Sequence, residues 1–185
     1  MTYGLKLFCQ YILWLPIFFL IPCLAESTNW PGFRGEGNSK TKIQSLPLKW
    51  TEKEGILWKN QISGFGQSSP VIWNDRIYIT STGGQSKESL YLDCYDLNSG
   101  KSIWKRTIKA TETVKKVTNM ISQGAPTPVT GPEGIYVFFE SGDLLAFNHE
   151  GKRLWERKLT EEFGPFKGGH GVGSSLVGVP ERLVL

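Results

Sequence analysis

Short segments of alternating apolar and polar residues begin near residue 70, and this period of two predicts β-strands. The alternation is clearest at Ile77 and Ile79, which share one face of their segment. A polar pair at residues 74–75 separates this segment from the one before it, as expected for an antiparallel hairpin. Four strands are predicted in this first unit, at residues 70–73, 76–80, 90–95 and 102–108.

The same order of elements occurs again further along the chain. A second unit is predicted with strands at residues 127–130, 135–139, 144–147 and 152–159, and a third unit begins near residue 172. The innermost strands of the three units are expected near residues 69–73, 126–130 and 174–178. No segment after residue 25 carries a sustained helical apolar face, so this part of the chain is predicted to be all-β.

The two complete units share a polar turn that leads into a tryptophan strand. Residues 96–104 (DLNSGKSIW) are echoed by residues 148–155 (NHEGKRLW). Trp58, Trp104 and Trp155 lie 46 and 51 residues apart, about the length of one propeller blade. The predicted fold is an incomplete β-propeller of four-stranded antiparallel blades, at residues 57–108, 109–159 and 160–185. Because propellers close with about four to eight blades, we expect the sequence to be part of a longer protein.

The first 25 residues differ from the rest of the chain and predict export. Lys6 precedes an apolar stretch, and Cys23-Leu24-Ala25 resembles the end of a cleavable signal peptide. Two alternatives remain: an uncleaved membrane anchor, which Pro16 and Pro22 disfavour, and lipid modification of Cys23, which Pro22 before it disfavours. If it stayed uncleaved, the leader would be the only contact with a membrane. Residues 26–56 are expected to form an extended N-terminal segment, because their Gly, Pro and polar content disfavours regular elements.

Net charge and cysteine content argue against a nucleic-acid-binding protein and against a fold held by disulfides. Removal of the leader takes away Lys6 and lowers the formal net charge from +4 to +3, which is too little to indicate nucleic-acid binding. Cys94 is then the only remaining cysteine, so no internal disulfide is expected. The expected location is the periplasm or the cell envelope.

The turn-and-tryptophan segments carry a family resemblance. The pattern Ala-x-Asp-x-x-x-Gly-x-x-x-Trp, with cysteine at its first position, is matched by Cys94, Asp96, Gly100 and Trp104. The second unit matches it with one residue fewer before the glycine, at Ala146, Asn148, Gly151 and Trp155. This pattern resembles the tryptophan-docking motif of pyrroloquinoline quinone (PQQ)-type β-propellers. The resemblance implies that the tryptophan packs between adjacent blades and that the small first residue makes room for it.

The resemblance extends to other segments. Residues 30–35 (WPGFRG), 57–59 and 66–71 resemble the opening of exported bacterial PQQ-like β-propeller repeat proteins, which are similar to the propeller of the outer-membrane protein assembly lipoprotein. This fold hosts unrelated functions. We therefore weigh two hypotheses: a non-catalytic scaffold that binds a protein or polymer of the envelope, and a fragment of a quinone-dependent dehydrogenase whose cofactor site lies mostly outside this chain.

The residues favour the scaffold without a cofactor or metal site. PQQ dehydrogenases of this architecture commonly use an adjacent cysteine pair and calcium ligands, and neither can be assigned here, so PQQ with calcium belongs only to the alternative. Cys94 is interpreted as a packing residue, and Asp96 and Asn148 as residues that hold turns. No catalytic residue is predicted. The glycine-rich residues 168–173 do not match a dinucleotide fingerprint, and they are interpreted as a loop before an inner strand.

Long connections between units locate the candidate interaction face. Residues 109–124, 160–171 and 81–88 are expected on one side of the propeller, whereas the turns on the other side are short. Binding residues often lie on long loops of a rigid scaffold. His170 is the first candidate for a ligand site, because it precedes a channel-lining strand. The candidate interaction face consists of Lys115, Lys116, Asn119, Phe166, Lys167 and His170.

Overall fold

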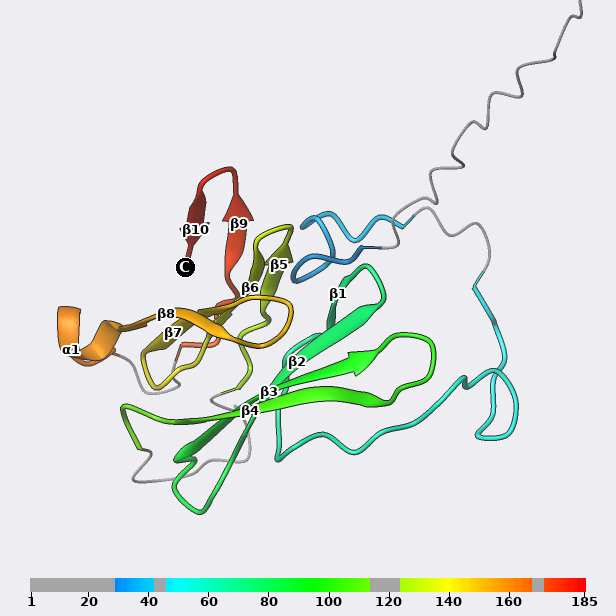
Figure 1. The fold of residues 1–185 in the computed structure, drawn as a ribbon, viewed down its shortest axis with the longest axis horizontal. Helices are drawn as coiled ribbons and strands as arrows, with labels where there is room; N and C mark the ends of the chain where they lie inside the picture. The colour runs from blue at the N-terminus through cyan, green and yellow to red at the C-terminus, as the bar shows by residue number, and fades with distance from the viewer. Residues whose placement is uncertain (1–28, 42–45, 114–123, 168–171) are drawn as a thin grey trace, which may run out of the picture.

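Two four-stranded antiparallel sheets and a hairpin make up the computed structural model, which describes residues 29–41, 46–113, 124–167 and 172–185 (Figure 1). The first sheet has the order β1 (Val71–Trp73), β2 (Arg76–Gly83), β3 (Ser89–Asp96) and β4 (Ser102–Lys109). The second has the order β5 (Val129–Gly131), β6 (Gly134–Phe138), β7 (Asp143–Phe147) and β8 (Arg153–Lys158). The hairpin consists of β9 (Val177–Val179) and β10 (Arg182–Val184), and a five-residue helix, α1 (Leu159–Phe163), follows β8.

Local turn chemistry explains why neighbouring strands pair in sequence order. Asn74 adopts a φ of 55° between β1 and β2, and Gly100 a φ of 67° between β3 and β4. Asparagine and glycine tolerate this left-handed conformation better than other residues. The chain therefore reverses within a few residues, and each strand pairs with the next one along the sequence.

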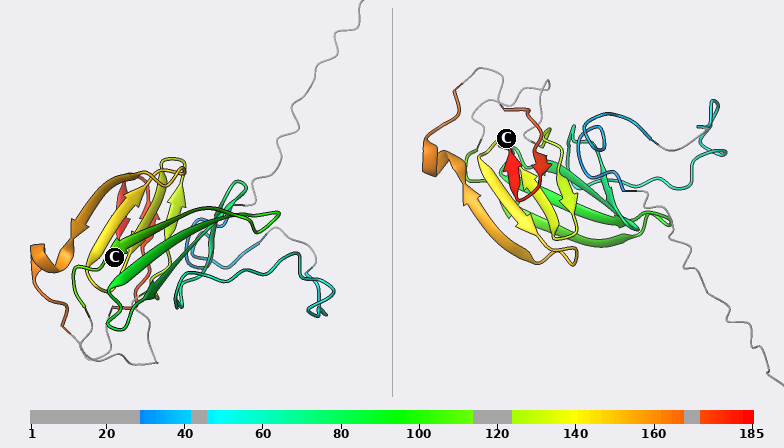
Figure 2. Two further views of the ribbon diagram at one scale, coloured as in Figure 1. Left: turned by 60° about the horizontal axis from the view of Figure 1, so that its bottom comes forward. Right: turned by 90° about the horizontal axis from the view of Figure 1, so that it is seen from above.

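The second sheet lies between the first sheet and the β9–β10 hairpin (Figure 2). Alternate side chains of β6 face opposite ways, so that Val137 joins the core shared with the first sheet and Phe138 joins a smaller cluster on the other face. The shared core contains Val71, Tyr78, Leu90, Leu92, Cys94, Ile108, Ala110, Ile135, Val137, Phe139, Leu145 and Phe147. The two sheets are thus held together by a continuous apolar layer.

An N-terminal segment joins the inner strands of the two sheets. The backbone N–H and C=O of Trp30 bond to the C=O and N–H of Ile72 in β1, both at 2.9 Å. The next residue, Pro31, accepts a hydrogen bond of 2.8 Å from the N–H of Thr130 in β5. The Trp30 ring packs over Gly35, where a Cβ atom would lie 2.9 Å from the indole. Residues 30–35 therefore bridge both sheets at their inner edges.

The predicted all-β class with four-stranded antiparallel sheets is confirmed, with differences of detail. The helix α1 was not predicted; it begins at Leu159, which was expected to end the strand at residues 152–159, and the Leu159 side chain packs in the smaller buried cluster. The connection expected at residues 81–88 is shorter, because β2 continues to Gly83 through its pairing with β3. The leader and its possible cleavage site lie outside the described residues. Among the described residues there is no helix with the length and apolar character needed to span a membrane.

Candidate functional site: the contacts between repeats and the loop face

The small residue and the tryptophan of each motif lie opposite each other on neighbouring strands. Cys94 in β3 pairs with Trp104 in β4, and Ala146 in β7 pairs with Trp155 in β8. Both small residues are fully buried, and the strand register shifts immediately after each of them. Burial raises the pKa of the Cys94 thiol to about 12. The thiol is therefore protonated at neutral pH and is a poor nucleophile.

The polar motif residues bond within their own turns. The Asp96 carboxylate accepts hydrogen bonds from the backbone N–H and hydroxyl of Ser99, at 2.7 and 2.6 Å. These bonds to Ser99 lower the pKa of Asp96. The Asn148 side-chain oxygen accepts a bond of 2.7 Å from the N–H of Lys152. Both side chains are engaged in fixing the turn that presents the glycine.

Trp58 docks on the first of these turns. Its indole N–H donates to the carbonyl of Leu97 at 2.9 Å. A Cβ atom added to Gly100 would lie 2.5 Å from the ring, so only glycine admits the indole at this distance. Two residues after the tryptophan, the Asn60 side-chain amide donates to the carbonyl of Gly100.

Trp104 docks in the same way on the turn of the second sheet. Its indole N–H donates to the carbonyl of His149 at 2.9 Å, and a Cβ atom on Gly151 would lie 2.8 Å from the ring. Arg106, two residues after the tryptophan, donates to the carbonyls of Gly151 at 2.6 Å and Glu150 at 3.1 Å. Its guanidinium lies 5.0 Å over the Trp104 ring, a cation–π distance. The tryptophan of one repeat thus contacts the glycine of the next.

His149 lies at the centre of this contact, although sequence reasoning treated it only as a turn residue. Its Nε2–H donates to the carbonyl of Gly131 at 2.9 Å, and Nδ1 accepts from the Tyr78 hydroxyl at 2.8 Å. This assignment follows because a carbonyl can only accept. The ring stacks on Trp73 at 6.3 Å between centroids, and the backbone carbonyl also accepts from Arg76. Burial raises the pKa of Tyr78, which keeps its hydroxyl a donor. No signal in the sequence marked His149, because most of its partners, Trp73, Arg76 and Tyr78, come from the first repeat.

Two buried carboxylates were also missed. Asp93 accepts bonds from the N–H and hydroxyl of Ser63, at 3.0 and 3.2 Å, and a bond of 3.1 Å from the Tyr95 hydroxyl. Asp143 accepts bonds from the N–H and hydroxyl of Thr111, at 2.9 and 2.6 Å. Buried acids attract attention as catalytic groups. Here each one holds a segment that precedes its own sheet, which is a structural role.

The candidate interaction face is described only in part. Phe166 is 36% exposed, and its ring meets Phe138 edge-on at 6.0 Å between centroids, whereas Lys167 is exposed. Phe163 of α1, which sequence reasoning did not select, is 74% exposed. The remaining members of the face lie outside the described residues: Lys115, Lys116, Asn119 and His170.

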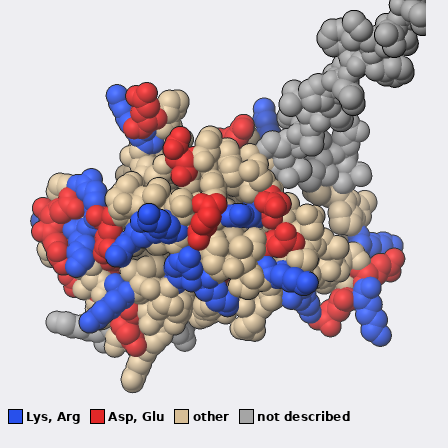
Figure 3. Space-filling view, in the orientation of Figure 1, with Lys and Arg blue, Asp and Glu red and all other residues tan. Residues whose placement is uncertain are grey.

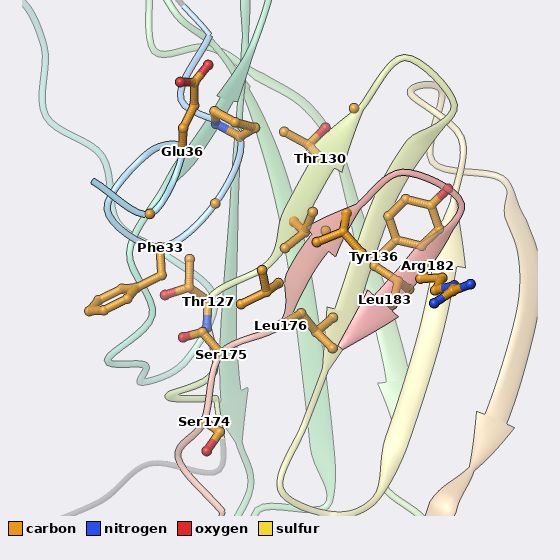
Figure 4. Close-up of a pocket in the computed structure, with 18 of the residues that line it drawn as sticks. Phe33, Glu36, Thr127, Thr130, Tyr136, Ser174, Ser175, Leu176, Arg182 and Leu183 are labelled. Atoms are coloured by element: carbon orange, nitrogen blue, oxygen red, sulfur yellow. The ribbon is translucent and has the colours of Figure 1, made fainter. Parts of the chain in front are cut away.

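A groove of about 1570 Å³ lies on the outer side of the second sheet (Figure 4). Phe33 of the N-terminal segment forms one wall, Tyr136 lies on the sheet, and Leu183 of β10 forms the opposite wall. Trp155 and Arg157 of β8 also line it. Since Trp155 is 38% exposed, its indole lies at a partly open surface.

None of the His, Cys, Asp and Glu side chains in the described part of the chain form a group of three or more that could hold a metal ion. Charged side chains of both signs are interspersed on the face shown in Figure 3, so this face carries no broad field of one sign.

Tryptophans that dock on glycine turns between four-stranded sheets define a PQQ-like β-propeller repeat protein. The chain belongs to the family described as outer membrane protein assembly factor BamB, which matches residues 49–166. The predicted resemblance to PQQ-like repeat proteins is thereby confirmed.

Similar solved structures include BamB from Moraxella catarrhalis, at 14% identity and a TM-score of 0.47, over 70% of this chain and 36% of that one. A europium-containing methanol dehydrogenase matches at 19% identity and a TM-score of 0.34, over 48% of this chain and 14% of that one. The chain thus spans about a third of the length of that BamB and about a seventh of the length of the dehydrogenase. A comparison with curated proteins gave no significant match.

Proposed function

We propose that the chain is part of an exported, non-catalytic β-propeller scaffold that binds a protein or polymer of the bacterial cell envelope. The observation that carries the proposal is membership of a family described as an outer membrane protein assembly factor. The apolar leader with Lys6 before it supports export. The periplasm is the compartment that both features favour.

The loop face around α1 is the proposed binding surface. Phe163 and Phe166 expose aromatic surface there, and Lys167 adds an exposed cation next to Phe166. Aromatic residues are enriched at the few positions that contribute most of the binding free energy of a protein interface. Beneath them, Phe138 and Leu159 anchor the segment in a buried cluster. The proposal also includes the predicted members that lie outside the described residues: Lys115, Lys116, Asn119 and His170.

Site-specific photo-crosslinking in the envelope of the host bacterium tests this surface. A photoreactive residue at Phe163 or Lys167 of the full-length protein should capture a specific envelope partner. The matched control is the same residue at Ile103, which is also an exposed apolar position but lies on the outermost strand β4. Equal capture at Ile103 and Phe163, or no capture at the loop face, would contradict the assignment.

The Phe163→Ala variant supplies a second measurement. Because the side chain is 74% exposed, its removal should change the free energy of unfolding by less than about 0.5 kcal/mol. Recovery of the partner should nevertheless fall several-fold. Dye-linked alcohol oxidation by the full-length protein with PQQ and calcium would replace the scaffold proposal with the dehydrogenase alternative.

A further inference from the structure

A hydroxyl residue precedes each of the two four-stranded sheets, and a buried carboxylate of that sheet holds it in both cases. Ser63 donates its N–H and its hydroxyl to Asp93 of β3, at 3.0 and 3.2 Å. Thr111 donates the same two groups to Asp143 of β7, at 2.9 and 2.6 Å. Both carboxylates are fully buried, and both belong to the third strand of their sheet. We call this pair of donors on one third-strand acid a hydroxyl clamp.

The two acids stand at different places along their strands, so the hydroxyl clamp does not depend on one fixed register. Asp93 lies within β3, opposite Lys105 of β4, whereas Asp143 is the first residue of β7. Each acid also accepts a hydroxyl from a residue two positions away, Tyr95 at 3.1 Å or Ser141 at 2.6 Å. The shared feature is therefore a carboxylate that receives the N–H and O–H of the connection before the sheet.

Thr160 follows the second sheet in the same way that Thr111 follows the first. The residue before each threonine, Ala110 or Leu159, donates its N–H to the carbonyl of the residue directly before the third strand, at 2.9 and 2.8 Å. Ala110 packs in the core that the first sheet shares with the second. Leu159 packs in the smaller cluster, which contains Leu176 of the third unit. The two threonines are thus equivalent residues of successive repeats.

The Thr160 hydroxyl differs from the other two because it has no partner. Its oxygen is buried, and within the part of the chain that the structure describes it is the one buried side-chain oxygen or nitrogen without a hydrogen bond. A Cβ atom added to Gly142 would lie 2.8 Å from this oxygen, so the hydroxyl lies against the start of β7. A buried hydroxyl without a hydrogen bond destabilises the folded state. We therefore expect the complete protein to supply an acceptor.

We propose that Thr160 is the donor of a third hydroxyl clamp, and that its acceptor is an aspartate or glutamate side chain in the third strand of the third repeat. That strand follows β10, because β9 and β10 are the first two strands of this repeat. Both described clamps use a carboxylate, and hydrogen bonds to a charged acceptor are stronger than those to a neutral one. The inference rests on the propeller in the proposed function, but not on the binding of an envelope partner.

Thermal unfolding of the full-length protein tests the third clamp with valine variants, since valine has the shape of threonine but cannot donate. Thr111→Val should lower the midpoint by about 2 °C or more, because Asp143 loses a donor. Thr160→Val should lower it by a similar amount. Thr107→Val is the control, because Thr107 is an exposed residue of β4, and its shift should stay below about 1 °C.

A double-mutant comparison identifies the acceptor. Each aspartate or glutamate in the third strand of the third repeat, or directly before it, is replaced by alanine in turn. Once the acceptor is removed, Thr160→Val should cause less than half of the loss that it causes alone. The proposal is overturned if Thr160→Val alone leaves the midpoint unchanged, if that strand carries no acid, or if the loss is the same in every alanine background. Failure to capture an envelope partner while the clamp is intact would count only against the proposed function.

Discussion

The two faces of the second sheet carry related residues but differ in how completely they are covered. On the face toward the first sheet, Val137 and Phe147 join a continuous core, and Trp104 is seated on Gly151. On the other face, Phe138 belongs to a smaller cluster and Trp155 is partly exposed. The first face is covered by a complete blade, whereas two three-residue strands pack against the second. Trp104 is thus seated on a glycine turn, whereas Trp155 packs against Tyr136 at a partly open surface.

The largest expected difference is that between Trp104 of β4, which docks on the covered face, and Trp155 of β8, which lies on the less covered face. Trp104→Ala should lower the free energy of unfolding by about 3 kcal/mol, because it removes ring contacts, the bond to His149 and the Arg106 stacking. Trp155→Ala should cost about 1 kcal/mol or less, since the ring has fewer partners. Urea unfolding of the two variants measures both values. Equal losses would mean that the faces do not differ in the way described.

A somewhat smaller effect is expected at the glycine that receives Trp104. Gly151→Ala should cost about 2 kcal/mol, because a Cβ atom would lie 2.8 Å from the indole and φ is 76°. The matched control is Gly164→Ala, where φ is also positive, at 85°, and no atom lies within 4 Å of the added Cβ. Comparison of the urea midpoints checks the prediction. A control variant as unstable as Gly151→Ala would show that glycine itself, rather than the docked ring, explains the loss.

The smallest effect concerns a titrating group near the less covered face. Glu140 is partly buried beside Val172, and desolvation raises its carboxyl pKa above the ordinary value. A raised pKa in the folded state favours folding at low pH, and this contribution is lost as the pH rises through the folded pKa. Glu140→Gln should therefore raise the thermal midpoint slightly at about pH 7 and leave it unchanged at about pH 4. An equal change at both pH values would assign the effect to packing.

Local patterns in the sequence account for the sheets but not for the contacts between them. The strand order and the turns at Asn74 and Gly100 were predictable, because period-two alternation and left-handed turn residues act over a few positions. The helix α1 was missed, since five residues give no helical period to recognise. The extension of β2 to Gly83 was missed because it depends on pairing with β3.

The contacts between repeats were harder to predict from the sequence than the strands and turns. The motif identified Trp104 and Gly151 as structural residues, but it did not show that they contact each other. The side chains of His149 and Asp143 bond to Tyr78 and Thr111, respectively, which lie far away in the sequence. Such partners are set by the packing of whole sheets. The assignment of Phe166 and Lys167 to an interaction face stays a prediction.

The bridge formed by residues 30–35 has a consequence for the order in which the structure assembles. This segment is synthesised before either sheet, yet its backbone partners, Ile72 and Thr130, are made later. Trp30 can pair with Ile72 only once β1 is in place, and Pro31 with Thr130 only once β5 is in place, because contacts between distant residues form only after the intervening loops close. Residues 30–35 are thus among the last to complete their hydrogen bonds, and the full set of these bonds requires that two neighbouring repeats have already packed together.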